Sequence, residues 1–365
     1  MPLTKYIDLS IYTGQIMNKE SVLAQELPYW EFMSEPLPHL ILWDGSLSTT
    51  LELSPIDIEC FDEARVNQLT LGLRSFVNSL PEGLTAQLFI RVESDFQEML
   101  DKHKSLSSTR TLFLKSVDDL RVSELESSIA SGHVFKPKIY FTLRTRGAEK
   151  PKTFSLSATK KFASEFAASY EDLLQTLSQA SESAKGQLES LGFRCHDLTK
   201  ETLIQIIYQH LNPRRADQLS PPKVAARCEL DEDSPREQLV FGDLVLDKED
   251  FLLDSKRTRL LTLKTLPEVT FAGMMNGFLR FPFKYELFFS FSIPDQTKEI
   301  RGLEQKRRMA HSLAHSTSNR VSDLESESKL TQTTDLIREI IETGQRVFQA
   351  EFGIILRESN TLEGN

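Results

Sequence analysis

Two places in this sequence put a nucleophilic or metal-binding side chain next to a suitable neighbour. At the first, Cys195 is followed directly by His196, the residue types that form a thiolate–imidazole pair in nucleophilic catalysis. We expect residues 193–196 to form a short strand, and adjacent side chains of a strand point to opposite faces of the sheet. The thiol and the imidazole would then be unable to meet, so we predict no catalytic residue here.

The second place holds His311 and His315, which are one turn apart on a predicted helix and could share a metal ion. The sequence HSLAH lacks the glutamate of the H-E-x-x-H metalloprotease pattern, and no third ligand is evident. A solvated helix face is the better interpretation. We predict no metal site.

A nucleotide site would require a phosphate-binding loop, whose backbone N–H groups and lysine hold the phosphates. The pattern G-x-x-x-x-G-K-S/T occurs nowhere in the 365 residues. We therefore expect no cofactor on this chain and no ATP hydrolysis by it alone. ATP would act only in a longer or partner protein.

Three basic clusters could contact an anionic surface. They are Arg214 with Arg215, Lys256 with Arg257 and Arg259, and Lys306 with Arg307 and Arg308. Each cation near an anionic membrane contributes about 1 kcal/mol of attraction. Cations are also common at helix C-termini and on solvent-exposed helix faces, without any binding role. For the three clusters together, we therefore favour ordinary surface positions over an anion-binding role.

Composition argues against a protein built to bind polyanions. The chain is 39% hydrophobic and 26% charged, as in soluble globular proteins, with a formal net charge of -10. An aromatic segment at 281–291 could stack nucleic-acid bases if it were exposed, but its alternation of apolar and polar residues is typical of a strand that faces a core. We expect no strong nucleic-acid binding.

Three widely spaced cysteines, Cys60, Cys195 and Cys228, are typical of a reducing compartment. The N-terminal residues contain no apolar stretch of signal-peptide length. The most apolar stretch, 271–293, is interrupted by charged residues and is a poor membrane span. These features predict a cytoplasmic protein whose membrane contact is peripheral or through partners.

Hydrophobic periodicity predicts an α+β fold with mixed or antiparallel sheets and packed helices. The halves share an order of hairpin, helix, strand, further helix and strand, which suggests two related split β-α-β units. The predicted strands are 39–43, 47–53, 84–92, 135–144, 193–196, 239–246, 259–265, 284–293 and 352–356; the predicted helices are 59–80, 95–99, 112–129, 154–191, 199–210, 268–281 and most of 297–348.

Composition shifts divide the chain into five parts. The prolines and the acidic run between residues 214 and 238 indicate a linker. The predicted organisation is an N-terminal arm at 1–37, a first α+β domain at 38–213, a linker at 214–238, a second α+β unit with a helical hairpin or long helix at 239–357, and a frayed tail at 358–365.

Four passages, in this order and spacing, carry a resemblance to a known family. They are LILWDG at 40–45 with Leu80 and Pro81, LIQIIYQHLNPRR at 203–215, LLTLKTLP at 260–267, and FPFKYEL at 281–287 followed by Gln296 and the basic residues Lys306, Arg307 and Arg308. Over residues 38–357 the chain resembles the N-terminal region of the TraC/VirB-type ATPases of conjugative type IV secretion systems. It departs from that family's pattern by ending at Asn365, before any P-loop domain.

The resemblance implies a docking and assembly region that contacts inner-membrane components of the secretion system and neighbouring ATPase subunits, peripheral to the inner membrane. It also singles out Arg214 and Arg215 among the basic residues, because they lie in a matching passage. Two alternatives remain open. The chain is the truncated front of an ATP hydrolase, or it is a nucleic-acid-binding accessory protein that uses Arg214, Arg215, Lys306, Arg307 and Arg308.

Overall fold

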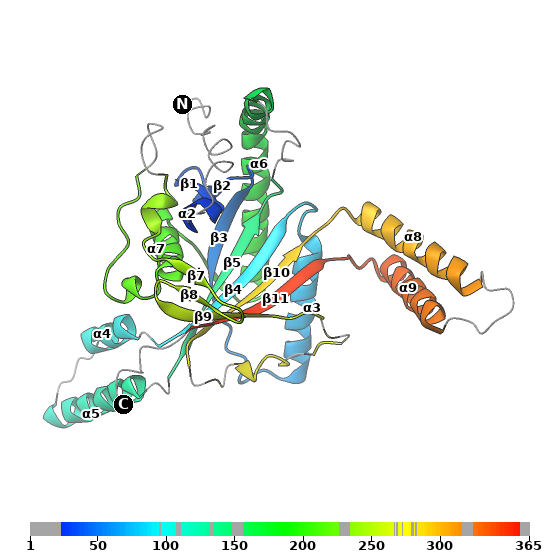
Figure 1. Cartoon of the computed structure of the whole chain (residues 1–365). Helices are drawn as coiled ribbons and strands as arrows, with labels where there is room; N and C mark the ends of the chain where they lie inside the picture. Colours follow the sequence, from blue (N-terminus) through cyan, green and yellow to red (C-terminus); the bar gives the residue numbers. More distant parts are fainter. Residues whose placement is uncertain are drawn as a thin grey trace.

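The computed structural model describes residues 23–357, with gaps at 95, 107–110, 132–133, 148–155, 226–233, 266, 268, 272, 279–280, 282 and 316–323. Its centre is one large antiparallel sheet with helices on both faces (Figure 1). The predicted α+β class is confirmed.

The order of strands in this sheet repeats in the two halves of the chain. The sheet runs β1-β2-β3-β5-β4-β10-β11-β9-β8-β7, and β6 pairs with β3 outside this path. Read from either edge to the centre, each half places its strands in the sequence order first, second, third, fifth, fourth. In each half a helical hairpin connects the fourth strand to the fifth. The predicted relationship between the halves therefore has a structural counterpart in this common topology.

The first half begins with a three-stranded meander. Asp44 and Gly45 form the turn between its second and third strands, where Gly45 adopts a positive φ of 77°. Helix α3 is capped by the Asp62 side chain, which accepts a hydrogen bond from the N–H of Arg65. The elements are β1 (Tyr29–Met33), β2 (His39–Leu42), β3 (Leu47–Ser54), α3 (Glu63–Ser79), β4 (Thr85–Glu93), α4 (Gln97–Leu106), α5 (Leu112–Ala130) and β5 (Lys136–Arg144), preceded by the short α2 (Leu23–Glu26).

Two helices and a short strand connect the halves. Helix α6 (Leu156–Ser190) is followed by Gly192, whose positive φ of 101° is typical of a residue just after a helix C-terminus. Strand β6 (Arg194–Asp197) follows, and then α7 (Lys200–Leu211). Thr199 caps α7, because its side chain accepts a hydrogen bond from the N–H of Thr202.

The second half contains β7 (Leu244–Leu246), β8 (Phe251–Leu253), β9 (Lys256–Thr262), β10 (Tyr285–Ser292), α8 (Gln296–His315), α9 (Leu324–Thr343) and β11 (Gln349–Arg357). Strand β10 pairs with β4 over eight residues, from Tyr285 opposite Val92 to Ser292 opposite Thr85. This pairing joins the two halves. Helices α8 and α9 pack against each other as a hairpin, one of the two arrangements predicted for this segment, and project away from the sheet (Figure 1).

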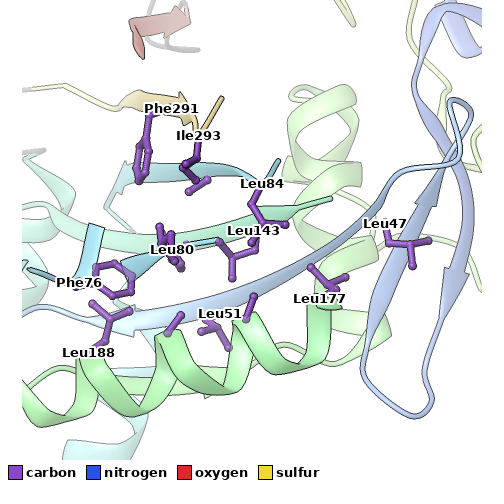
Figure 2. Packing of buried hydrophobic residues seen from close by; sticks show 14 of the residues in the cluster. Leu47, Leu51, Phe76, Leu80, Leu84, Leu143, Leu177, Leu188, Phe291 and Ile293 are labelled. Atoms are coloured by element: carbon purple, nitrogen blue, oxygen red, sulfur yellow. The ribbon is translucent and has the colours of Figure 1, made fainter. Parts of the chain in front are cut away.

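The main hydrophobic core lies between one face of the sheet and helices α3 and α6. Figure 2 shows Leu177 and Leu188 of α6 packed beneath the strands, with Leu51 of β3 and Leu143 of β5 above them. Phe291 of β10 belongs to the same buried cluster. The second half therefore contributes to the core of the first.

The opposite face of the sheet packs against α7. Phe89 and Arg91 of β4 alternate with the core residues Ala86 and Leu88, so they lie on this other face. A second buried cluster joins α7 to the first two strands; it consists of Phe32, Leu40, Leu42, Leu203, Ile204, Ile207, Tyr208, Leu211 and Leu239.

Two parts of the sequence interpretation need correction. The helix predicted at 268–281 is wrong, since the described residues there form turns between 273 and 277, where Gly273 has a positive φ of 83°. The segment 268–281 has low helix propensity, because it contains Gly273 and Gly277 and follows Pro267. The strand predicted at 239–246 is shorter, because Glu237–Leu239 is a 3-10 turn and β7 begins at Leu244.

The domain bounds stay a prediction, but three observations bear on them. Residues 29–33, within the predicted N-terminal arm, form strand β1 of the sheet. The sheet continues across the predicted linker, and within that linker Val224 packs against the α7 cluster. The predicted tail at 358–365 lies outside the described residues.

No helix within the described part of the chain is long and apolar enough to cross a membrane.

Candidate interaction site

A buried carboxylate holds α7 to the centre of the sheet. Glu286 of β10 lies 2.7 Å from Nη1 of Arg357 on β11, measured at Oε2, and 3.1 Å from Nε of Arg91 on β4, measured at Oε1. Nδ1 of His210, on α7, lies 3.2 Å from Oε2. Three strands and one helix thus converge on one carboxylate.

The charge of Glu286 is stabilised by these partners. Burial alone would raise its pKa, but the hydrogen bond and charge of His210, with the charges of Arg357 and Arg91, lower the pKa far below the usual range of a carboxyl. Arg91 also donates from Nη1 to Oε1 of Gln209 at 2.8 Å. The last turn of α7 is therefore fixed by two adjacent side chains.

The residues that follow α7 anchor the strands of the second half. Asn212 is fully buried; its Nδ2 donates to the carbonyls of Tyr208 and Leu239, and its Oδ1 accepts from the N–H of Phe241. One side chain thus joins the helix end to the segment that leads to β7.

Arg214 and Arg215 combine a fixed backbone with exposed side chains. Their N–H groups both donate to Oδ2 of Asp254, at 2.8 and 2.7 Å, in the turn between β8 and β9. The Arg215 guanidinium lies 4.3 Å from the centre of the Phe241 ring. Because the backbone is held at two points, both guanidinium groups are presented to solvent from a rigid position.

The second predicted basic group lies elsewhere. Lys306 and Arg308 are exposed on α8 and Arg307 is half-buried, while Arg308 is 3.8 Å from Glu304. Figure 1 places α7 and α8 on opposite sides of the sheet. The structure therefore brings together Arg214 with Arg215, and separately Lys306 with its two neighbours, but it does not unite the five residues in one surface.

The third basic cluster is paired with acidic residues. Lys256 lies 2.7 Å from Asp217, Arg257 lies 3.2 Å from Asp250, and Arg259 lies 3.4 Å from Glu249. These pairs favour the structural interpretation of this cluster over an anion-binding role.

The structure does not bring together the cysteine and histidines that the sequence offered as catalytic or metal-binding residues. Cys195 faces the main core while its neighbour His196 is exposed, and burial raises the pKa of the Cys195 thiol. A thiol that stays protonated is a poor nucleophile. His311 is exposed, whereas the side chain of His315 lies outside the described part of the structure. Across the described ranges, no group of three His, Cys, Asp or Glu side chains is placed to hold a metal ion.

Sequence reasoning missed Glu286, His210 and Asp254. One signal for Glu286 was available, because an acidic residue inside the most apolar strand requires a partner. The identity of that partner was not readable, since His210 and Arg357 are distant from it in sequence. The contact also unites two of the passages quoted above, 203–215 and 281–287.

The family of this chain follows from its match to a known family model. Residues 23–361 match the family model described as TraC protein. The chain belongs to the TraC family. Membership in the TraC family involves the chain in type IV secretion and conjugation. A search of the curated proteins found no match.

The TraC match extends over β1 to β11 and so includes both halves of the sheet. It covers the Glu286 contacts, the Arg214 and Arg215 anchor, and both helical hairpins. The TraC part of the resemblance drawn over residues 38–357 is thereby confirmed as a family relationship.

Proposed function

We propose that this chain is a docking and assembly region of a conjugative type IV secretion ATPase. In this role it lies at the cytoplasmic side of the inner membrane, contacts inner-membrane components of the system and neighbouring ATPase subunits, and supports pilus assembly and substrate transfer. Membership in the TraC family supports the system. ATP hydrolysis belongs to a longer or partner protein in this proposal.

The observation that carries the docking role is the anchored pair Arg214 and Arg215. Two backbone hydrogen bonds to Asp254 and the buried side chain of Asn212 fix the position of this segment. Neither arginine has a side-chain ion pair among the described contacts, and both side chains are exposed. A pair of guanidinium groups on a fixed backbone suits an acidic protein surface, because little backbone freedom remains to be lost on binding.

Charge reversal tests this role directly. We expect Arg214→Glu combined with Arg215→Glu to reduce co-purification with the inner-membrane proteins of the same secretion system, and to reduce the frequency of conjugative transfer. The backbone hydrogen bonds to Asp254 do not depend on the side chains, so the fold should be retained.

The matched control reverses two other exposed arginines, Arg74→Glu with Arg194→Glu, for the same change in net charge. It should leave co-purification and transfer unchanged. Unchanged co-purification in the Arg214 and Arg215 variant would contradict docking through this site.

The nucleic-acid alternative receives less support. The two exposed basic groups lie on opposite sides of the sheet, and the Lys256 cluster is paired with acidic residues. A single strand of nucleic acid usually follows a continuous basic groove. DNA binding that weakens steeply with salt and is lost on reversal of these charges would favour that alternative.

A further inference from the structure

One ring nitrogen of His210 lies between a hydrogen-bond donor and a hydrogen-bond acceptor. Nδ1 is 3.2 Å from Oε2 of Glu286 on β10, and an ionised carboxylate can only accept. The same Nδ1 is 3.0 Å from Nη2 of Arg357 on β11, and a guanidinium can only donate. Because this nitrogen carries either a proton or a lone pair, it bonds to one of these neighbours at a time.

The protonation state of the ring decides which neighbour is bonded. With Nδ1 unprotonated, the ring accepts from Arg357, and Nε2 carries the proton of the neutral imidazole. In the imidazolium both nitrogens are donors, so Nδ1 donates to Glu286 and its charge repels the guanidinium 3.0 Å away. Protonation therefore exchanges a link between α7 and β11 for a link between α7 and β10.

Glu286 stays ionised in both states. Burial raises its pKa, but the hydrogen bond and charge of His210, with the charges of Arg357 and Arg91, lower the pKa far below the usual range of a carboxyl. When the ring is neutral, Arg357 and Arg91 still lie 2.7 and 3.1 Å from the carboxylate oxygens. Strand β4 also places the Phe89 ring against the imidazole, with 6.1 Å between the ring centres. The imidazole thus faces one anion, two permanent cations and one apolar ring.

The next ionisable side chains on this face of the sheet lie beyond Phe89. Tyr140 of β5 stacks on Phe89 with 6.3 Å between the ring centres, and burial raises the pKa of its hydroxyl. Glu52 of β3 lies opposite Tyr140, and Glu93 at the end of β4 is 2.7 Å from Nζ of Lys138. Tyr140 stays neutral and adds no charge to the surroundings of the imidazole.

Among the four side chains of the cluster, His210 is the one whose residue type changes charge near neutral pH. Arginine remains protonated in proteins, whereas histidine as a residue type titrates between about pH 5 and 8. The imidazole is also open to solvent, since 32% of the His210 side chain is exposed against 6% for Glu286. Protons can therefore reach the ring without unfolding of the cluster.

His210 and Arg357 lie at the ends of two elements. His210 is in the last turn of α7, and Arg357 is the last residue of β11. Nη2 of Arg357 also lies 3.4 Å from the His210 carbonyl, which belongs to the helix end where carbonyls lack partners within the helix. Loss of the Arg357 contact therefore frees the last turn of α7 from β11. The segment that begins at Arg214 follows four residues later.

We propose that His210 is a proton-dependent switch, which links α7 to the end of β11 when the ring is neutral and to β10 when the ring is protonated. The observation that carries it is the position of Nδ1 between Glu286 and Arg357. The inference goes beyond the proposed function and does not depend on it, because the switch acts within one chain.

A double-mutant cycle at two pH values tests the switch. His210→Leu removes Nδ1, and Arg357→Lys keeps a positive charge beside Glu286 but loses the planar fork that reaches two partners. Urea unfolding of the unaltered chain, the two single variants and the double variant gives the coupling between the two positions. At pH 8 we expect this coupling to change the unfolding equilibrium constant by about three- to tenfold, in favour of the folded state. At pH 5.5 we expect it to vanish or to reverse its sign. The pH dependence due to His39 is common to all four proteins and cancels in the cycle.

A variant that cannot titrate separates the switch from a general effect of pH. His210→Asn places an amide oxygen near the position of Nδ1, where it accepts at every pH. In this background the effect of Arg357→Lys on the unfolding equilibrium constant should be equal at pH 8 and pH 5.5. The matched control, His196→Asn at an exposed position, should leave the effect of Arg357→Lys dependent on pH, as in the unaltered chain.

Two results would overturn the proposal. One is a coupling of the same sign and size at pH 8 and pH 5.5; the other is a pH-dependent effect of Arg357→Lys in the His210→Asn background. If the Arg357 variant does not fold, hydrogen exchange of residues 207–211, corrected for the intrinsic effect of pH, replaces the cycle. Protection should then fall at pH 5.5 in the unaltered chain but not in His210→Asn, and equal behaviour of the two would also overturn the switch. Because these measurements use the purified chain alone, a failure here leaves docking through Arg214 and Arg215 intact, and loss of that docking leaves the switch intact.

Discussion

Glu286 is a buried carboxylate whose charge is stabilised by three neighbouring side chains. Its burial among Arg91, Arg357 and His210 means that neutralising it leaves two arginines without their counter-charge. We expect Glu286→Gln to lower the free energy of unfolding by about 3–5 kcal/mol in urea denaturation. The exposed Glu351→Gln on the adjacent strand β11 should change it by less than about 0.5 kcal/mol. Equal effects would show that the buried cluster is not stabilising.

His39 predicts a dependence of stability on pH. The buried ring donates from Nδ1 to the Leu37 carbonyl at 2.6 Å, and its Nε2 accepts from the Tyr170 hydroxyl at 2.9 Å. Burial lowers the pKa of His39, although the Leu37 carbonyl opposes this. The unfolded chain therefore binds a proton near pH 6.5 that the folded chain does not, so this contribution to stability is present above that pH and declines as the pH falls below it.

The test compares urea unfolding between pH 7.5 and pH 5.5. The His39→Phe variant should be less stable at every pH, because the Leu37 carbonyl and the Tyr170 hydroxyl lose their hydrogen bonds to the imidazole. Its stability should also change less with pH than that of the unaltered chain. His311→Gln, at an exposed position, should keep the original pH dependence. An identical pH dependence in the His39 variant would assign the effect to other groups.

Among the elements, α3 depends on an arginine from the far end of the chain. Nη1 of Arg346 donates to the carbonyls of Asn78 and Leu80, at 2.9 and 2.6 Å, at the C-terminal end of the helix. A cation there satisfies free carbonyls and suits the helix dipole. We expect Arg346→Ala to reduce stability by about 1.5–3 kcal/mol and to increase hydrogen exchange in the last turn of α3. Arg338→Ala, on the exposed face of α9, is the control, and equal exchange in the two variants would contradict this cap.

Gly353 on strand β11 leaves room for the aromatic ring of the residue opposite it on β10. A Cβ at Gly353 would come within 2.3 Å of the ring of Phe288, which lies opposite it on β10. We expect Gly353→Val to displace that ring and to cost about 1–3 kcal/mol of stability. Gly186→Ala, at a helical position with open space around it, should not be destabilising. A Gly353→Val variant as stable as the unaltered chain would show that the ring moves freely.

For the whole molecule, the central pairing of β4 with β10 predicts that the halves do not fold separately. Phe291 and Ile293 complete the main core, and removal of β10 would leave the edge of β4 unpaired. We expect residues 23–213 alone to aggregate or to unfold without cooperativity, and co-expression with residues 234–357 to restore a soluble complex. Cooperative unfolding of the first fragment alone would instead support the domain division predicted from composition.

Local patterns in the sequence were sufficient for most elements of the fold. Alternation and helical spacing act over a few residues, which is why the strands at 84–92 and 135–144 and the helix at 112–129 could be predicted nearly to their ends. Asn276 and the glycines at 273 and 277 outweighed the apolar periodicity of 268–281, and the helix predicted there was wrong. Similarly, the passages 203–215 and 281–287 carried the family resemblance without indicating that they touch.

Only the tertiary structure decided the arrangement of these elements. The antiparallel junction of β4 with β10, the burial of Glu286 against His210 and the anchoring of Arg214 and Arg215 to Asp254 all join residues far apart in sequence. Such contacts depend on which helix or strand packs against which face of the sheet. Hydrophobic periodicity shows only that a face is apolar and does not identify the element that covers it. The sequence by itself thus determined the α+β class, most of the element types and the TraC resemblance. The tertiary structure determined which faces are covered and which, like the outer face of α5, are exposed.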